Sequence, residues 1–197
     1  MKMGKMNIQG VISVCAFALF VVMVLIRAAT LRKRGIRALV FGQTDKSDFI
    51  LVPLVLAIAY TTLARTFGLP IWDVLIRPFW SSDFPGWIGL VLCMTALAGF
   101  ALTLISFGDS FRVGIDVNKP DKLVTGGMFS ISRNPIYVCF LLFFTGLFLV
   151  HRNIVIAVAM ILFALAIHRQ IIREERFLTE HYGDEYKAYC KKVRRYL

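Results

Sequence analysis

A polar loop that runs directly into an apolar helix, residues 123–137, holds the groups best suited to chemistry. Pro135 suits the first position of a helix, because its missing N–H would have no intrahelical partner there. Asn134 before it is a favoured N-cap residue. The backbone N–H groups at such a helix start attract anions, carboxylates among them. An ordinary capped helix would show the same pattern, so the loop predicts a site only in combination with a second cluster.

The second polar cluster lies near the C-terminus, where Glu174 and Glu175 precede a tyrosine-rich segment, residues 182–186. Neighbouring residues of a helix point about 100° apart, so the two glutamates cannot face one ligand. We expect one helix face to turn toward the first cluster, the face made by Gln170, Glu174, Phe177 and Leu178. The alternative is a solvated helix surface on which the glutamates form salt bridges with Arg169, Arg173 and Arg176.

The elements that would position these clusters are membrane helices. The chain of 197 residues is 58% hydrophobic and carries a net charge of +11, and its mean hydropathy is +0.70. The apolar residues are gathered into blocks, and runs of about 18 or more apolar residues are typical of transmembrane helices. We therefore expect an all-α, polytopic membrane protein with five transmembrane helices, near residues 8–26, 49–68, 86–107, 135–150 and 153–181.

No repeat or linker divides the chain, so we expect one domain over residues 1–197. The last two helices should form a tight hairpin that turns at residues 151–153. The last helix should continue as a cytoplasmic C-terminal segment, since residues 169–181 contain neither glycine nor proline. The fourth helix would reach only about 22 Å, less than the ~30 Å hydrocarbon core, which predicts that its Asn134–Pro135 end lies at membrane depth. Thr95, Gly99 and Thr103 in the third helix predict close helix packing.

Basic residues indicate the orientation of these helices. Six lie between the first two helices, four between the third and fourth, and eight after the fifth, which makes 18 of the 23 lysines and arginines. The opposite side has Lys2, Lys5, Arg77 and Arg152, and Arg65 can snorkel there. The positive-inside rule then places the N-terminus outside and both polar clusters in the cytoplasm. The first helix lacks a clear signal-cleavage site and should remain as an anchor.

The sequence lacks the motifs that are typical of metal sites, of nucleic-acid binding and of Rossmann-type nucleotide sites. The cysteines are scattered, and there is no Cys-x-x-Cys and no Cys/His cluster with zinc spacing, so we expect no metal site. Topology and anionic lipid account for the basic excess, and no nucleic-acid-binding motif accompanies it. No Gly-x-Gly occurs, which excludes the fingerprint of a nucleotide-binding Rossmann fold.

In their order and spacing, the two clusters resemble the isoprenylcysteine carboxyl methyltransferase family of membrane enzymes. The resemblance rests on four elements, which are Leu123-Val124-Thr125-Gly126-Gly127, Arg133-Asn134-Pro135-Ile136-Tyr137, Glu174-Glu175 and the tyrosine-rich residues 182–186. It covers roughly residues 107–197, which would form the catalytic part. The first two helices match the family only in hydropathy.

The resemblance implies that S-adenosylmethionine binds at the cytoplasmic face and that its methyl group passes to a lipid-like acceptor. The acceptor would be the C-terminal carboxylate of a prenylcysteine or a similar lipidated carboxylate, giving a methyl ester. Eight residues would bind the cofactor, namely Lys122, Leu123, Val124, Phe129, Asn134, Pro135, Tyr137 and Glu174. Gln170 and Arg173 would contact the substrate. Arg133 and Glu174 are candidates for catalysis by positioning, since an ionised carboxylate acceptor needs no general base.

The chain departs from the family pattern at three positions. Asn134 replaces a histidine, so no titrating group is present there. Gln170 stands where the eukaryotic enzymes have an arginine for substrate. The tail reads Val193-Arg194-Arg195 where family members commonly have valine-proline-arginine. The resemblance therefore extends to the donor site more fully than to the substrate site.

Two other kinds of function fit some of these features. A phospholipid N-methyltransferase, or another lipid-modifying enzyme of similar membrane fold such as a reductase, would share the site architecture. An amine acceptor would need removal of a proton, and the matched residues include no strong base. A non-catalytic transporter or scaffold would account for the helices, but it would not account for the paired clusters.

Overall fold

The computed structural model describes residues 7–33, 50–107 and 123–197, and every regular element within these ranges is a helix. Lys122, one of the predicted cofactor residues, lies outside them. Five long apolar helices form the body: α1 (Ile8–Lys33), α2 (Leu51–Phe67), α4 (Phe84–Phe107), α5 (Pro135–His151) and α6 (Ile154–Tyr182). Three short helices complete the described part: α3 (Asp73–Ile76), the 3₁₀ helix η3 (Gly127–Ser130) and α7 (Asp184–Lys192).

The observed bounds follow the predicted blocks, with the largest difference at α1. Hydropathy places the end of this helix at residue 26, whereas the helix continues to Lys33. Residues 27–33 include three basic residues, which end the apolar run, but neither glycine nor proline, so nothing in them breaks the helix. The continuation of α6 past His168 to Tyr182 agrees with the prediction. The short helices α3 and η3 were not predicted, because they are too short to show a hydrophobic period.

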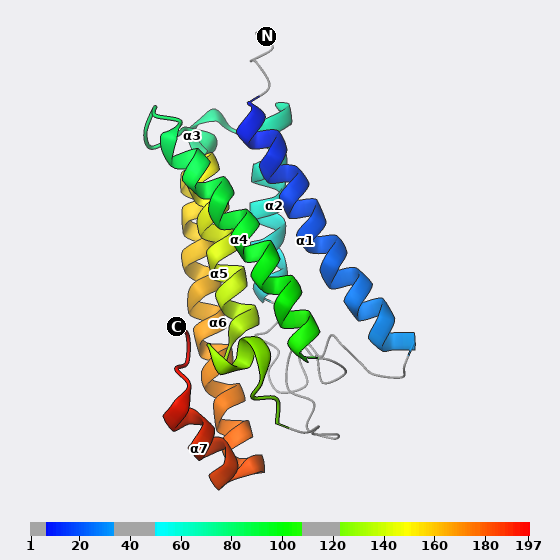
Figure 1. Cartoon of the computed structure of the whole chain (residues 1–197). Helices are drawn as coiled ribbons and strands as arrows, with labels where there is room; N and C mark the ends of the chain where they lie inside the picture. The colour runs from blue at the N-terminus through cyan, green and yellow to red at the C-terminus, as the bar shows by residue number, and fades with distance from the viewer. Residues whose placement is uncertain (1–6, 34–49, 108–122) are drawn as a thin grey trace.

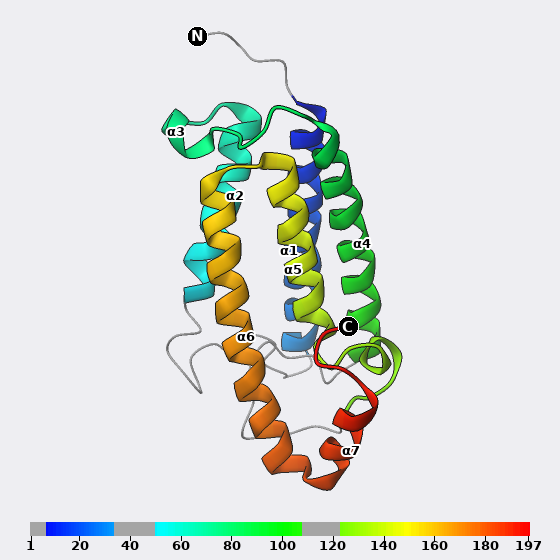
Figure 2. The same ribbon diagram turned by 90° about the vertical axis from the view of Figure 1, so that its left-hand side faces the viewer.

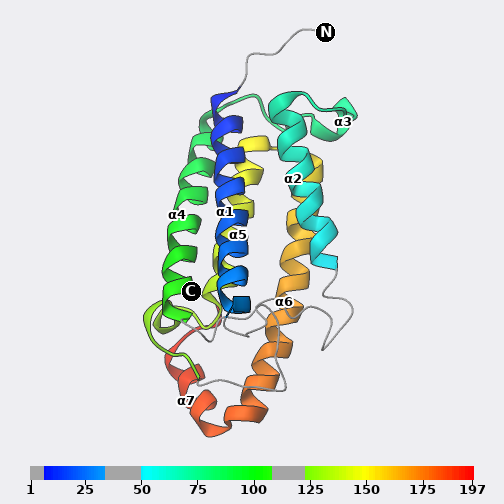
Figure 3. The ribbon, with the colours of Figure 1, turned by 90° about the vertical axis from the view of Figure 1, so that its right-hand side faces the viewer.

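The long helices run in alternating directions along one common axis (Figures 1 and 2). α4 and α5 approach so closely that a Cβ atom on either Gly89 or Gly146 would lie 2.5 Å from the carbonyl oxygen of the other. The predicted small-residue stripe lies only partly at this interface, where Gly99 faces Cys139, while Thr95 is exposed. α1 and α2 pack on the other side of the body, against α4 and α6 respectively (Figure 3).

The core of the bundle is rich in phenylalanine. The Phe20 ring of α1 stacks on Phe100 of α4 and on Phe143 of α5, with ring centroids 4.7 Å apart in both pairs. All three side chains are buried. These contacts fix α1, α4 and α5 relative to one another, and so they fix the end of α5 at which the first polar cluster lies.

Three of the helices, α1, α4 and α6, are long and apolar enough to cross a membrane, while α2 and α5 are shorter apolar helices of 17 residues. Large apolar side chains lie exposed on the outside of the bundle, among them Leu25, Leu56, Val91, Ile105 and Leu165. An apolar exterior of this kind is what a bilayer requires of the helices that contact it. Composition and structure together indicate an integral membrane protein.

At the end of the bundle near the N-terminus, residues 152–153 join α5 to α6. Arg152 has a positive φ of 44°, and Asn153 caps α6 by accepting the Ile156 N–H at 3.1 Å. The Arg152 guanidinium pairs with Asp83 at 2.5 Å, and its carbonyl accepts the Phe79 N–H at 2.8 Å. This turn is thereby bonded to the loop before α4.

The opposite end holds the second half of α6, which extends beyond the other helices. α7 folds back from its end, and the C-terminal tail, residues 193–197, returns toward the start of α5 (Figure 2). η3 lies against α4 at the same end. The two polar clusters identified in the sequence therefore meet at one end of the molecule, opposite the end at which α1 begins (Figure 1).

Candidate functional site

A chain of hydrogen bonds joins the start of α5 to α6. The Tyr137 hydroxyl donates to Glu174 Oε1 at 2.6 Å, and Gln170 Nε2 donates to the same oxygen at 2.9 Å. Arg173 Nη2 donates in turn to Gln170 Oε1 at 2.6 Å. Gln170 and Tyr137 are buried, with 5% and 8% of their surface exposed. Four of the predicted site residues thus form one connected polar group.

Of the predicted face of α6, Glu174 is the residue that bonds to α5. Glu174 reaches the first cluster through Tyr137, and Gln170 is hydrogen-bonded to Glu174 within α6. Phe177, on the same face, stacks on His181 one turn farther along α6, with ring centroids 5.9 Å apart. The position that sequence reasoning passed over is Glu175, whose side chain is only 12% exposed.

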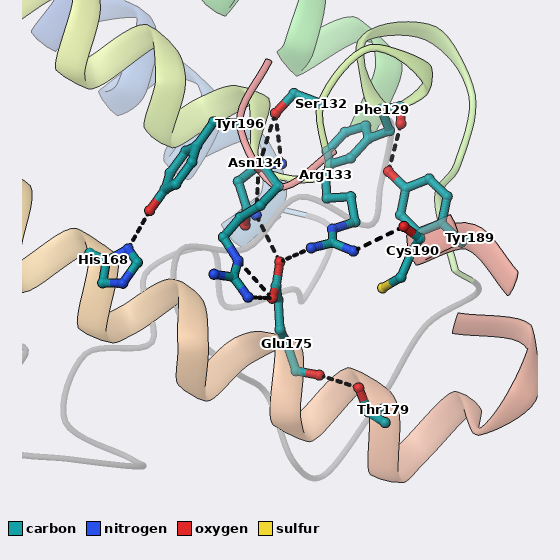
Figure 4. A network of polar contacts seen from close by, with 11 residues as sticks. Phe129, Ser132, Arg133, Asn134, His168, Glu175, Thr179, Tyr189, Cys190 and Tyr196 are labelled. Atoms are coloured by element: carbon teal, nitrogen blue, oxygen red, sulfur yellow. Dashed lines mark hydrogen bonds and ion pairs between the residues drawn. The ribbon is translucent and has the colours of Figure 1, made fainter. Parts of the chain in front are cut away.

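Glu175 is the centre of a second network, which is drawn in Figure 4. Its Oε1 atom accepts hydrogen bonds from Arg133 Nη2 at 3.0 Å and from Asn134 Nδ2 at 3.4 Å. Its Oε2 atom accepts from Arg195, at 3.0 Å from Nε and 2.8 Å from Nη2. The hydrogen bond to Glu175 raises the pKa of Arg195. The divergence of neighbouring helix positions separates the two glutamates, as expected, and gives each its own partners.

Asn134 does not act as the side-chain N-cap that its residue type predicts. Its backbone lies at φ −131° and ψ 52°, and its side chain makes no capping bond. Instead, Nδ2 donates to the carbonyl of Arg195 at 3.1 Å as well as to Glu175. These two bonds orient the amide toward the tail and Glu175, and its oxygen does not accept an N–H group of the first turn of α5. Pro135 does occupy the first turn of α5, as predicted.

The C-terminal tail runs across the loop before α5. Arg133 N–H donates to the carbonyl of Arg194 at 2.9 Å, and the Ser132 hydroxyl donates to the carbonyl of Arg195 at 3.3 Å. Farther along, the Tyr196 hydroxyl lies 2.5 Å from His168 Nδ1 of α6 (Figure 4). The sequence did not predict the contact between the tail and the loop, because the bonded residues lie about sixty positions apart and several of the acceptors are backbone carbonyls.

Apolar residues and α7 hold the loop from the other side. Phe129 of η3 is buried, and its ring packs edge-on against Phe107 at 4.6 Å. Its carbonyl accepts the Tyr189 hydroxyl at 2.6 Å. Burial raises the pKa of Tyr189 to about 12, so this hydroxyl remains a donor at neutral pH. Leu123 and Val124, two further predicted cofactor residues, are half-buried at the beginning of the described loop.

Arg133, a candidate for catalysis, is held by its partners. Besides the ion pair with Glu175, its Nη1 atom donates to the carbonyl of Cys190 at 3.5 Å. Its Nε atom is buried and has no hydrogen-bond partner among the described residues. Burial, together with the nearby Glu175 carboxylate, raises the pKa of Tyr186. The guanidinium thus bonds to α6 and α7 through its two terminal nitrogens, while its Nε atom has no partner among the described residues. Within the described ranges, no group of three metal-ligating side chains occurs.

Comparison with known proteins gives one matched region that holds the first cluster and all of the second except its last residue. A family model described as phospholipid methyltransferase matches residues 84–185. The probable protein-S-isoprenylcysteine O-methyltransferase of Oryza sativa subsp. indica is 31% identical over 124 residues, which are 60% of this chain and 62% of that protein. The protein-S-isoprenylcysteine O-methyltransferase of Schizosaccharomyces pombe is 33% identical over 96 residues, 46% of this chain and 39% of that protein.

A third relative, protein-S-isoprenylcysteine O-methyltransferase B of Arabidopsis thaliana, is 30% identical over 125 residues, which are 60% of either protein. The matches therefore span about three fifths of the plant relatives' length. The family match begins at α4, twenty-three residues before the region to which the sequence motifs pointed.

Proposed function

Since this chain belongs to the phospholipid methyltransferase family and has protein-S-isoprenylcysteine O-methyltransferases among its relatives, we propose that it is a membrane methyltransferase of the isoprenylcysteine type. It would use S-adenosylmethionine to form a methyl ester on the C-terminal carboxylate of a prenylcysteine or a similar lipidated acceptor. The observation that carries this proposal is the meeting of the α5 start with Glu174 of α6, through Tyr137 at 2.6 Å.

The residues at this end fit the amino-acid part of S-adenosylmethionine, which has a carboxylate and an ammonium group. The first turn of α5 and the partnerless Nε of Arg133 are donors suited to the carboxylate. Glu174 is an acceptor suited to the ammonium group or to ribose hydroxyls. Lys122, Leu123, Val124, Phe129, Asn134, Pro135 and Tyr137 would complete the donor site, with the Asn134 amide acting through its bonds to Glu175 and the tail.

The main task of this chain in the reaction would be to position the methyl donor and the acceptor. S-adenosylmethionine supplies, when bound, a methyl group on a sulfonium sulfur, which is a good leaving group. A carboxylate acceptor is ionised at neutral pH, so no residue has to remove a proton. Alignment of the acceptor oxygen with the methyl group would provide most of the rate. Arg133 and Glu174 would hold the donor, while Gln170 and Arg173, which are hydrogen-bonded to each other at 2.6 Å, would contact the acceptor.

The proposed topology has five membrane spans, with α5 and α6 as a hairpin. Two observations support it. The five long helices alternate in direction (Figure 2), and the exposed side chains of α6 change from apolar at Leu165 to polar at His168 and Arg169. The basic residues then favour an outside N-terminus and a cytoplasmic site. In this arrangement residues 107–197 would be the catalytic part of a single domain.

The test uses the purified full chain with methyl-labelled S-adenosylmethionine and a farnesylcysteine analogue. A methyl ester would release labelled methanol in base, and we expect this product. Phospholipid N-methylation is the second candidate, favoured by the description of the matching family model. Its product would carry base-stable label in the lipid fraction. Label in neither fraction, with no S-adenosylmethionine binding, would favour a non-catalytic membrane protein.

A further inference from the structure

Two adjacent glutamates of α6 hold different segments of this chain, and only one of them contacts Tyr137. We propose that Glu175 is a positioning residue, which fastens the C-terminal tail (residues 193–197) to the start of α5 and thereby completes the methyl-donor site. This proposal rests on the proposed function, because the site that it completes is the one assigned to S-adenosylmethionine. In this proposal the tail is required for full affinity of the donor site.

Each carboxylate oxygen of Glu175 serves a different segment. Oε1 accepts from Arg133 and Asn134, which directly precede the first turn of α5. Oε2 accepts only from Arg195 of the tail, through two guanidinium nitrogens at 3.0 and 2.8 Å. A carboxylate that binds Arg through two nitrogens fixes direction as well as distance. Glu175 therefore bonds directly, from α6, both to the loop and to the tail.

Charge explains why this position would need a carboxylate. Two guanidinium groups, Arg133 and Arg195, meet one carboxylate in a largely buried setting, where the Glu175 and Arg133 side chains are 12% and 11% exposed. Removing the negative charge would leave the two cations facing each other without an anion between them. Breaking a buried pair on one side is costly, since it leaves a charge uncompensated. The tail is the more exposed of the two partners, with Arg195 at 37%, and it would be released first.

Release of the tail would change the donor site through Asn134. The Asn134 amide bonds both to Glu175 and to the Arg195 carbonyl, and it directly precedes Pro135. The same carbonyl accepts Ser132, and the Arg194 carbonyl accepts Arg133 N–H. A displaced tail would therefore remove three bonds from the segment that sets the direction of the first turn of α5. Glu174 and Tyr137 would keep their own bond.

The experiment compares Glu175→Gln with Glu180→Gln, a matched change at an exposed position of the same helix. A nitroxide on Leu197→Cys, in a background with Cys15→Ser and Cys190→Ser, reports tail mobility. Calorimetry with S-adenosylhomocysteine reports donor-site affinity without turnover. In Glu175→Gln we expect a mobile tail and at least tenfold weaker binding, with the KM for S-adenosylmethionine rising more than kcat falls. Glu180→Gln should match the wild type.

A second variant keeps the test decisive if Glu175→Gln folds poorly. Arg195→Gln leaves the Arg133–Glu175 pair intact and should release the tail with a smaller loss of affinity. Combining it with Glu175→Gln should cost no more than Glu175→Gln alone. An immobile tail in both variants, or a mobile tail with unchanged binding, would overturn the positioning role. Failure of the wild type to bind S-adenosylhomocysteine or S-adenosylmethionine would instead overturn the proposed function.

Discussion

At the scale of single residues, Glu174 is the side chain on which donor binding should depend most. Its Oε1 atom already accepts two hydrogen bonds, from Tyr137 and Gln170, so it is held in place before any ligand arrives. We expect Glu174→Gln to weaken S-adenosylhomocysteine binding about ten- to hundredfold, since a charge-assisted hydrogen bond contributes about 1.5–3 kcal/mol. Calorimetric titration measures this. Equal, small effects of Glu174→Gln and Glu180→Gln would return Glu174 to a structural salt-bridge role.

Arg194 stands where the family pattern that the sequence resembles has proline, and the structure shows that either residue fits this position. The loop uses the carbonyl of Arg194, which proline also has, while the arginine side chain is exposed. Val193 before it lies at φ −123° and ψ 136°, the region that a residue preceding proline adopts. The departure from the family pattern therefore leaves the path of the tail intact.

We accordingly expect Arg194→Pro to fold and to retain donor binding. Fewer conformations of the unfolded chain should raise the free energy of unfolding by up to about 1 kcal/mol. Thermal unfolding in detergent and calorimetry with S-adenosylhomocysteine measure the two effects. Arg195→Pro is the control, since it removes the guanidinium that binds Glu175 and should lower affinity. A loss of binding in Arg194→Pro as large as in Arg195→Pro would contradict this account.

The residues that sequence reasoning placed correctly are those whose partners are set by local geometry. Pro135 at the first turn follows from its chemistry, and the separation of Glu174 from Glu175 follows from helix periodicity. The roles of Asn134 and Glu175 did not follow, because their partners are Arg195 and its carbonyl. A carbonyl about sixty residues away leaves no mark on side-chain pattern. The burial of Glu175 and its pairing with two arginines are visible only in the structure.

At the scale of elements, the contact of α4 with α5 determines where the site end of α5 lies. Gly146 lies against backbone of α4, so a Cβ atom there would be 2.5 Å from the Gly89 carbonyl, which cannot rotate away as a side chain could. Hydropathy predicted both helices, but it could not show which small residues meet. The stripe of Thr95, Gly99 and Thr103 was the expected interface, whereas the closest approach is at Gly89, six residues before the first residue of the stripe.

We therefore expect Gly146→Ala to be destabilising, although alanine favours helices more than glycine does. Overpacking of a close helix contact costs about 1–3 kcal/mol. Gly126→Ala is the matched control, since its backbone lies at φ −95° and a Cβ there meets nothing within 4 Å. Thermal unfolding in one detergent compares the two. An unchanged melting temperature in Gly146→Ala would mean that α4 and α5 lie farther apart than the structure shows.

At the scale of the whole molecule, Ser82 and Thr125 lie at opposite ends of the bundle. Ser82 lies just before α4, whereas Thr125 lies just before η3, which contacts the other end of α4 through Ser106 and Phe107. Both residues are exposed. In the proposed topology, an impermeant thiol reagent applied to intact cells should label Ser82→Cys and should reach Thr125→Cys only after permeabilisation. Cys15 and Cys190, which are not buried, are replaced by serine in the background. Labelling of both positions from the same side would overturn the five-span arrangement.

The dimensions of α5 bear on how a lipidated acceptor would reach the site. α5 has 17 residues, about 25 Å at the usual rise, and this is shorter than the ~30 Å hydrocarbon core. If α5 spans the membrane as proposed, Asn134 and Pro135 lie at membrane depth, where protein-lined irregular backbone is tolerated. The acceptor would then approach sideways from the bilayer, while the cofactor approaches from the cytoplasm past α6 and the tail.

This route predicts that activity rises with the apolar length of the acceptor. Farnesyl- and geranylgeranyl-cysteine analogues should be methylated far better than S-methyl or S-butyl analogues, since each buried CH₂ contributes about 0.8 kcal/mol. The gain should appear in KM, expressed per lipid-phase concentration so that simple partitioning into the membrane is removed. Short analogues that match the long ones after this correction would show that the site does not bind the lipid chain. The acceptor would then be a carboxylate that is recognised by its head group alone.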